Sequence, residues 1–172
     1  MNWLKIVVAL LCIIASSYVT FTIPVTETGI PFTLQSLMVF VVAAFLNVHE
    51  VKICVLAYIF LGLVGLPVFA DGSSGMDKIM GPSGGFLYGF YFSAWFISSM
   101  IDDFKPLKLY NLLLIFLAAT LILFLFGLGH LAFKFDVEKA LEYGLYPFWK
   151  MALVKALLAT LIVALTKRDI MV

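Results

Sequence analysis

One basic residue stands in the middle of an apolar run near the end of the chain. Lys155 lies in the run 148–165, about eight residues after Pro147, so a helix would carry it about 12 Å into the run. An ammonium group inside a membrane costs about 2.5 to 3.5 kcal/mol on insertion scales, and such a group usually faces a cavity or a partner. Beside it runs a stripe of small residues, on which another helix can pack closely: Ala152, Ala156, Thr160 and Ala164. We therefore expect Lys155 to point into the protein and to bind the anionic group of a ligand.

Lys155 has an alternative set of partners inside the protein. Asp71 and Asp77 lie in a polar loop, and the carbonyl groups of that loop could also accept hydrogen bonds from an ammonium group. The other charged residues lie at the ends of apolar runs, so we expect no carboxylate at the depth of Lys155. The sequence leaves both interpretations open.

Ser83 and His130 are residue types that nucleophilic catalysis uses. Ser83 lies in the sequence Gly81-Pro82-Ser83-Gly84, and His130, in a later apolar run, could serve as its general base. The pattern is short, however, and arises easily in a Gly-rich loop. We expect Ser83 to shape the loop, and a serine protease is the weaker alternative.

The composition places these residues in a membrane protein. Of the 172 residues, 64% are apolar and 12% are charged, whereas about a quarter of the residues of a soluble domain are charged. The length allows about six spanning helices and leaves no room for a soluble domain. The formal net charge of +1 lacks the basic excess that a phosphate-binding face needs, so we expect no nucleic-acid partner.

Six long apolar runs divide the chain. They cover residues 3–21, 34–46, 51–66, 86–101, 107–133 and 148–165. We expect each run to be a transmembrane helix, although the second is short for a span. The first should stay in the mature protein rather than leave as a signal peptide, because it extends past Ala15-Ser16-Ser17. The expected fold class is an all-α integral membrane protein with six transmembrane helices, in which residues 1–172 form a single domain.

The basic residues between the runs predict the orientation in the membrane. If the N-terminus is cytoplasmic, the inner segments carry the larger share of these residues: Lys5, Lys52, Lys105, Lys108, Lys167 and Arg168. The outer segments then carry Lys78, Lys134, Lys139 and Lys150. We therefore expect a multi-pass protein of the cell membrane with both termini in the cytoplasm.

A polar, glycine-rich stretch, "GLPVFADGSSGMDKIMGPSGG", joins the third and fourth runs on the outer side. Its composition predicts neither helix nor strand. Irregular backbone near a bilayer is tolerated only where protein buries it or where it lines an aqueous cavity, and structureless loops of this length are usually functional. We expect this loop, with the outer connection "FTIPVTETGIPFTLQ", to cover an outward-facing pocket to which Gln35, Tyr88, Tyr91 and His130 contribute.

Residues suited to holding a metal or a cofactor are scarce in this sequence. Cys12 and Cys54 both fall inside apolar runs, where a small buried thiol is a more ordinary role than a disulfide or a metal pair. No nucleotide-binding motif is present. We expect no metal, no cofactor and no enzymatic activity.

Three segments carry a resemblance to a known family. "IPFTLQSLMVFVVAAFL", "YIFLGLVGLPVFADGSSGMDKIMGPSGGFLYGF" and "YPFWKMALVKALLA" follow one another in the order found in BioY, the biotin-binding membrane subunit of energy-coupling factor (ECF) transporters. The resemblance runs from about residue 21 to residue 165. It implies six helices, a biotin pocket roofed by the outer loops, and partners comprising a transmembrane coupling subunit and two cytoplasmic ATPases. The substrate-binding residues expected on this basis are Lys155, Gln35, Tyr88, Phe69, Gly84 and His130.

The chain departs from the family pattern in two places. Members of the family commonly have an Asp three residues before the Lys of the last helix, and this chain has Ala152 before Lys155. Either the recognition of the ureido ring or the ligand itself is therefore open, and another vitamin-like carboxylate is an alternative. In the first helix, Cys12, Ser16 and Thr20 stand where the family has an alanine-based motif for contact with the coupling subunit, so Cys12 and Ser16 are the expected partner contacts.

Two other classes of protein compete with this interpretation. Gly81-Pro82-Ser83-Gly84 at the start of the fourth run also resembles the rhomboid intramembrane serine proteases, but the last run has no His where that family has its base. A self-sufficient secondary transporter would ordinarily show an internal repeat or matching broken helices, and the sequence shows neither.

Overall fold

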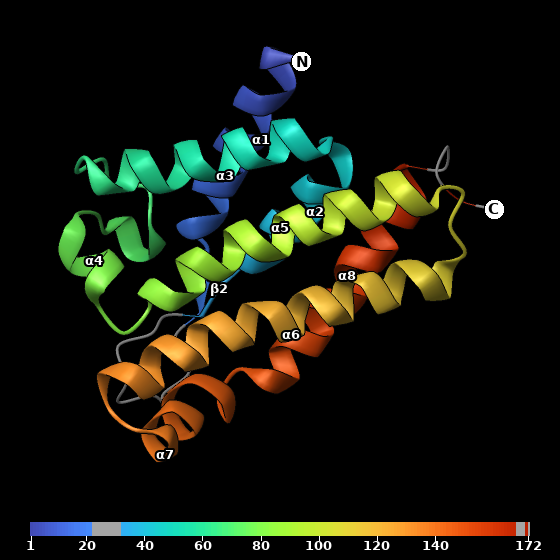
Figure 1. Cartoon of the computed structure of the whole chain (residues 1–172). Helices are drawn as coiled ribbons and strands as arrows, with labels where there is room; N and C mark the ends of the chain where they lie inside the picture. The colour runs from blue at the N-terminus through green and yellow to red at the C-terminus, as the bar shows by residue number, and fades with distance from the viewer. Residues whose placement is uncertain (22–31, 168–170, 172) are drawn as a thin grey trace.

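Six long helices form a bundle in the computed structural model, which describes residues 1–21, 32–167 and 171 (Figure 1). Most of the predicted second outer connection, 22–31, and Arg168 lie outside these residues. The six long helices are α1 (Trp3–Ser17), α2 (Gln35–Phe45), α3 (Val48–Leu63), α5 (Gly84–Phe104), α6 (Leu109–Lys134) and α8 (Trp149–Thr166). Each falls on one of the six apolar runs, so the positions of the helices were predicted correctly.

Short elements connect the long helices. They are β1 (Thr20–Phe21), β2 (Phe32–Thr33), the 3-10 turn η1 (Ala70–Gly72), α4 (Met76–Met80), α7 (Val137–Ala140) and the π-helical turn η2 (Leu141–Leu145). β1 and β2 pair antiparallel, with Thr20 opposite Thr33. The sequence predicted no regular structure in the loop 65–85, and this was wrong, because residues 76–80 form a helix. Gly75, directly before α4, permits that helix to start: its φ is +90°, and its N–H donates to the carbonyl of Gly62 at 2.7 Å.

A capping box separates α2 from α3. The side chain of Asn47 accepts the N–H groups of His49 and Glu50 at 3.1 and 3.0 Å, and the carboxylate of Glu50 accepts the N–H of Asn47 at 3.4 Å. The same carboxylate accepts the N–H of Asn2 at 2.7 Å. The start of α1 is thereby fastened to the turn between α2 and α3.

Small residues let α5 and α6 approach each other closely. A Cβ atom added to Gly85 would lie 2.5 Å from the carbonyl oxygen of Phe126 and 3.1 Å from the Cα of Gly127. A Cβ added to Gly89 would lie 2.9 Å from a methyl group of Leu123. The two helices lie side by side (Figure 1), and both contribute residues to the wall of the cavity described below.

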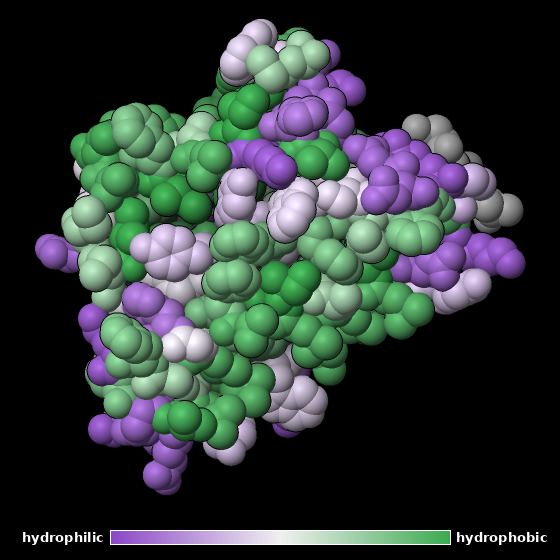
Figure 2. All heavy atoms as spheres, in the orientation of Figure 1, coloured by the Kyte–Doolittle hydropathy of each residue, from purple (hydrophilic) through white to green (hydrophobic). Residues whose placement is uncertain are grey.

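The surface of the bundle is largely apolar. In Figure 2, hydrophobic residues cover most of the visible face, and hydrophilic residues gather near the termini and around α4 and α7. Among the described residues, α6 and α8 are long and apolar enough to cross a membrane. α2, with 11 residues, spans only about 16 Å.

Candidate ligand-binding cavity

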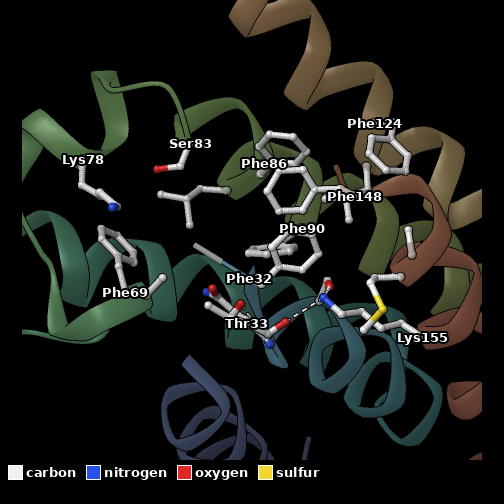
Figure 3. A pocket seen from close by; sticks show the side chains of 17 residues that line it. Phe32, Thr33, Phe69, Lys78, Ser83, Phe86, Phe90, Phe124, Phe148 and Lys155 are labelled. Carbon is white, nitrogen blue, oxygen red and sulfur yellow. Dashed lines mark hydrogen bonds between the residues drawn. The ribbon is translucent and has the colours of Figure 1, made fainter. Parts of the chain in front are cut away.

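A cavity of about 100 Å³, partly open to solvent, lies between α4 and the long helices α2, α5, α6 and α8 (Figure 3). The side chains that line it are Phe32, Thr33, Gln35, Ser36, Phe69, Ala70, Lys78, Ser83, Phe86, Leu87, Phe90, Leu123, Phe124, Phe148, Met151, Ala152 and Lys155. The polar loop 65–85 does contribute to the wall, as the sequence predicted.

Aromatic rings form most of the middle of the cavity. Phe32 of β2 stacks on Phe148, with ring centroids 4.2 Å apart and planes at 15°. Phe86 of α5 lies 6.4 Å from both Phe148 and Phe124. These rings come from segments far apart in the sequence and present flat apolar surfaces to a ligand. The cavity therefore suits a compact ring system rather than a flexible polar chain.

Lys155 reaches the cavity from α8, and its ammonium group has partners within the protein. Its Nζ donates to the carbonyl of Thr33 at 2.7 Å and to the hydroxyl of Ser36 at 3.0 Å (Figure 3). Among the described residues, no carboxylate forms an ion pair with Lys155, so the alternative pairing with Asp71 or Asp77 is absent there. Lys155 does bind a backbone carbonyl group, which was the other alternative, but that carbonyl belongs to β2 and not to the loop 65–85. An ammonium group has three N–H donors, so one remains for a ligand.

The amide of Gln35 is oriented by a chain of hydrogen bonds. The hydroxyl of Tyr58 donates to the carbonyl of Val68 at 3.0 Å, so its single hydrogen is used there. Tyr58 can then only accept from Gln35, which places the NH₂ group of the amide against Tyr58. The carbonyl oxygen of Gln35 is left as an acceptor for a group in the cavity.

Lys78 of α4 is the second basic residue of the cavity wall. Figure 3 shows its side chain at the opposite end from Lys155, with the aromatic rings between them. From the sequence, Lys78 was expected only as a charge on the outer side, not as a residue of the site. The signal was present, because it is a charged residue inside the loop that was expected to cover the pocket.

The structure brings three of the six expected substrate-binding residues together. Gln35, Phe69 and Lys155 line the cavity, whereas Tyr88, Gly84 and His130 do not. His130 lies 2.9 Å from the carbonyl of Gly81 through its Nε2, and its ring is 6.5 Å from that of Tyr88. The N–H of Gly84 also bonds to the carbonyl of Gly81, at 3.0 Å. These contacts hold the turn between α4 and α5, which carries Ser83 into the wall.

Ser83 and His130 do not form a catalytic pair. Both residues are described by the structure, and no hydrogen bond joins them, because His130 is engaged with Gly81. A general base must lie within hydrogen-bond reach of the nucleophile it activates. The arrangement therefore gives the protease interpretation no support.

The two expected partner contacts of α1 lie in different surroundings. Cys12 is partly exposed and lines an apolar groove between α1 and α2, of about 450 Å³. Ser16 is buried, and its hydroxyl donates to the carbonyl of Ile13 at 2.7 Å. Within the described residues, Cys12 and Cys54 are free thiols, and no cluster of three or more potential metal ligands is present.

Comparison with known proteins decides the family. A model of the BioY family matches residues 1–171. The chain belongs to the BioY family. Similar members are the biotin transporter BioY2 of Lactococcus lactis subsp. cremoris, 35% identical over 134 residues, and the biotin transporter BioY of Thermotoga maritima, 34% identical over 140 residues. The first match covers 77% of this chain and 73% of the relative, and the second covers 81% and 82%.

A solved structure shares the fold. The crystal structure of the S-component for biotin from an ECF-type ABC transporter matches with a TM-score of 0.84 and 21% sequence identity, over 96% of this chain and 90% of that chain. The BioY assignment from the three sequence segments is thus confirmed. The broader expectation of an all-α membrane protein is confirmed with it.

Proposed function

We propose that this BioY protein captures biotin in the cavity and serves biotin uptake as the S subunit of an ECF-type ABC transporter. The observation that carries this proposal is the cavity itself. Within the described residues its wall is aromatic, it contains two lysines, and no carboxylate lines it. A site of this kind selects an anionic ligand with an apolar ring system.

The groups of biotin match the groups of the cavity wall. The fused rings and the aliphatic tail are apolar and can lie against Phe32, Phe86 and Phe148. The ureido group has N–H donors, for which the carbonyl oxygen of Gln35 is an acceptor, and an oxygen that a lysine can approach. Gln35 thus offers an acceptor in a site where Ala152 supplies none. Binding is non-covalent, and the assignment to a transporter family agrees with the expectation that the chain is not an enzyme.

We place the protein in the membrane with all six long helices as spans and both termini in the cytoplasm. The basic residues between the helices support this orientation. The exposed side chains of α1 and α8 include many leucines and valines, which suit contact with lipid. In this orientation α4 and the turn before α5 lie on the outer side, so the cavity opens toward the source of the vitamin.

The partners we propose are a transmembrane coupling subunit and two cytoplasmic ATPase subunits. The chain lacks a nucleotide-binding motif, so it cannot drive uptake by itself. The solved protein of the same fold is described as a component of an ECF-type transporter. On α1, the exposed side of Cys12 is the accessible part of the predicted contact, whereas Ser16 acts through the packing of the helix.

Calorimetric titration of the purified protein in detergent tests the proposed function. We expect biotin to bind with 1:1 stoichiometry, since one cavity carries the required groups. Desthiobiotin, which keeps the ureido group and the carboxylate, should compete. Absence of heat, together with absence of competition by any analogue, would remove biotin from the account and leave another vitamin-like carboxylate as the ligand.

A further inference from the structure

The two lysines of the cavity differ in what already surrounds their ammonium groups. Two of the three N–H donors of Lys155 are used by Thr33 and Ser36. In the part of the chain that the structure describes, the ammonium group of Lys78 forms neither a hydrogen bond nor an ion pair, and only its backbone is bonded, to Gly75 and Gly81. Its neighbour Asp77 is exposed, and adjacent residues of a helix do not face each other. Lys78 is therefore the cation with its full donor capacity available to a ligand.

The positions of the two lysines also favour different ligand groups. Lys78 lies on a short surface helix at one end of the cavity, and Lys155 lies at the other end, next to β2 and the first turn of α2 (Figure 3). A carboxylate is the most strongly hydrated part of a biotin-like molecule, so it loses less hydration beside a surface helix than deep among helices. A neutral ureido oxygen loses much less hydration deep among the helices. It needs only one donor, and Lys155 has one N–H left.

From these observations we infer that Lys78 binds the carboxylate of the ligand and that the ring system points away from α4, toward Lys155. This inference rests on the proposed function, because it specifies how the ligand lies in the same cavity. It reverses the expectation from the sequence, which assigned the anion to Lys155. It also makes Lys78 the residue that distinguishes a carboxylate from its uncharged analogues.

Titration of two ligands against matched variants tests the inference. Biotin and biotinamide, which lacks the negative charge, are titrated against the parent protein, Lys78→Met and Lys150→Met. Lys150 is exposed, lies in the first turn of α8 and does not line the cavity, so its variant controls for the loss of one positive charge. We expect Lys78→Met to lower the affinity for biotin about tenfold, as for a partly desolvated ionic contact.

Biotinamide supplies the internal control for folding. Its affinity should change less than about twofold in Lys78→Met, because the variant keeps the ring-binding end of the cavity, and Lys78→Arg should restore the preference for biotin. An unchanged preference for biotin in Lys78→Met would overturn the inference while leaving the proposed function intact. Loss of that preference in Lys155→Met instead would also overturn it. Failure of the parent to bind either compound would overturn the proposed function, and the inference with it.

Discussion

The chemistry of this site depends on how single polar side chains are held. Lys155 is fixed by a backbone carbonyl and a hydroxyl, and the amide of Gln35 is fixed by Tyr58. Each residue therefore presents one defined group to the cavity, a donor from Lys155 and an acceptor from Gln35. Groups held in this way need little ordering when a ligand binds, which favours affinity.

Replacing Lys155 with methionine should separate its binding role from its structural role. The variant should keep the fold, because methionine is apolar and of similar length and because the groups it leaves behind are neutral. Affinity for biotin should fall about tenfold or more, since a hydrogen bond from a charged donor is worth about 1.5 to 3 kcal/mol. Biotinamide should lose affinity to the same extent if Lys155 contacts the ring end of the ligand.

Titration calorimetry and a thermal melt in detergent check this prediction together. Lys150→Met is the matched control and should behave as the parent in both measurements. Unchanged binding by a well-folded Lys155→Met would show that the ammonium group serves only Thr33 and Ser36.

Helix geometry explains why two of the expected residues, Tyr88 and His130, lie outside the site. Ser83, directly before α5, lines the cavity with Phe86, Leu87 and Phe90 of the helix, and the steps from 83 to 86 or 87 and from 86 or 87 to 90 are three or four positions, which places them on one helix face. Tyr88 comes two residues after Phe86, which turns it about 200° around the helix and away from the cavity. His130 comes seven residues after the lining residue Leu123, so it lies on the same face of α6 but about 10 Å farther along the helix, where it contacts Gly81. Polarity alone does not reveal the face of a helix, and tertiary packing decides it.

The helices around the cavity were predicted more completely than the individual residues that line it. The apolar runs gave the long helices, since their lengths and the punctuating Pro and Gly residues are local properties. The contact of Phe32 with Phe148, by contrast, depends on how β2 and α8 meet in space. The local sequence of neither segment determines this tertiary contact.

At the scale of elements, the close contact of α5 with α6 should determine stability. Gly85→Ala places a Cβ 2.5 Å from the backbone carbonyl of Phe126, so the helices must move apart. Overpacking of this kind costs about 1 to 3 kcal/mol. We expect a lower midpoint of thermal unfolding in detergent.

Gly129→Ala is the matched control for Gly85→Ala. It lies on α6 with nothing within 4 Å of the added Cβ, and alanine favours a helix over glycine by about 1 kcal/mol. Its melting midpoint should therefore not fall. Equal melting of the two variants would contradict the close packing of α5 on α6.

At the scale of the whole molecule, the described residues present a largely apolar surface with a recess beside α1. Cys12 lies in this recess, the groove between α1 and α2, and no residue that lines the groove also lines the ligand cavity. Ligand capture and contact with a partner can therefore occupy separate parts of the molecule. This division is what a subunit that binds but does not power transport requires.

Adding bulk at Cys12 should block transport and spare binding. Cys12→Leu fills the groove and prevents close approach of a partner helix, without touching the cavity. In proteoliposomes containing the coupling subunit and the ATPases, uptake of biotin should fall to background, while biotin binding in detergent stays within about twofold of the parent. Leu125→Phe, on an exposed position of α6, adds bulk elsewhere and should transport normally. Normal uptake by Cys12→Leu would place the partner contact on another surface.

The central claim, that biotin occupies this cavity, is tested most directly by filling the cavity. Ala152 lines it, whereas Val154, two residues along the same helix, is exposed at 44% and lies outside it. Equilibrium titration with biotin should show 1:1 binding to Val154→Trp, as to the parent, and no measurable binding to Ala152→Trp, because the indole takes the place of the ligand rings. Binding of biotin to a folded Ala152→Trp with the affinity of the parent would contradict the account.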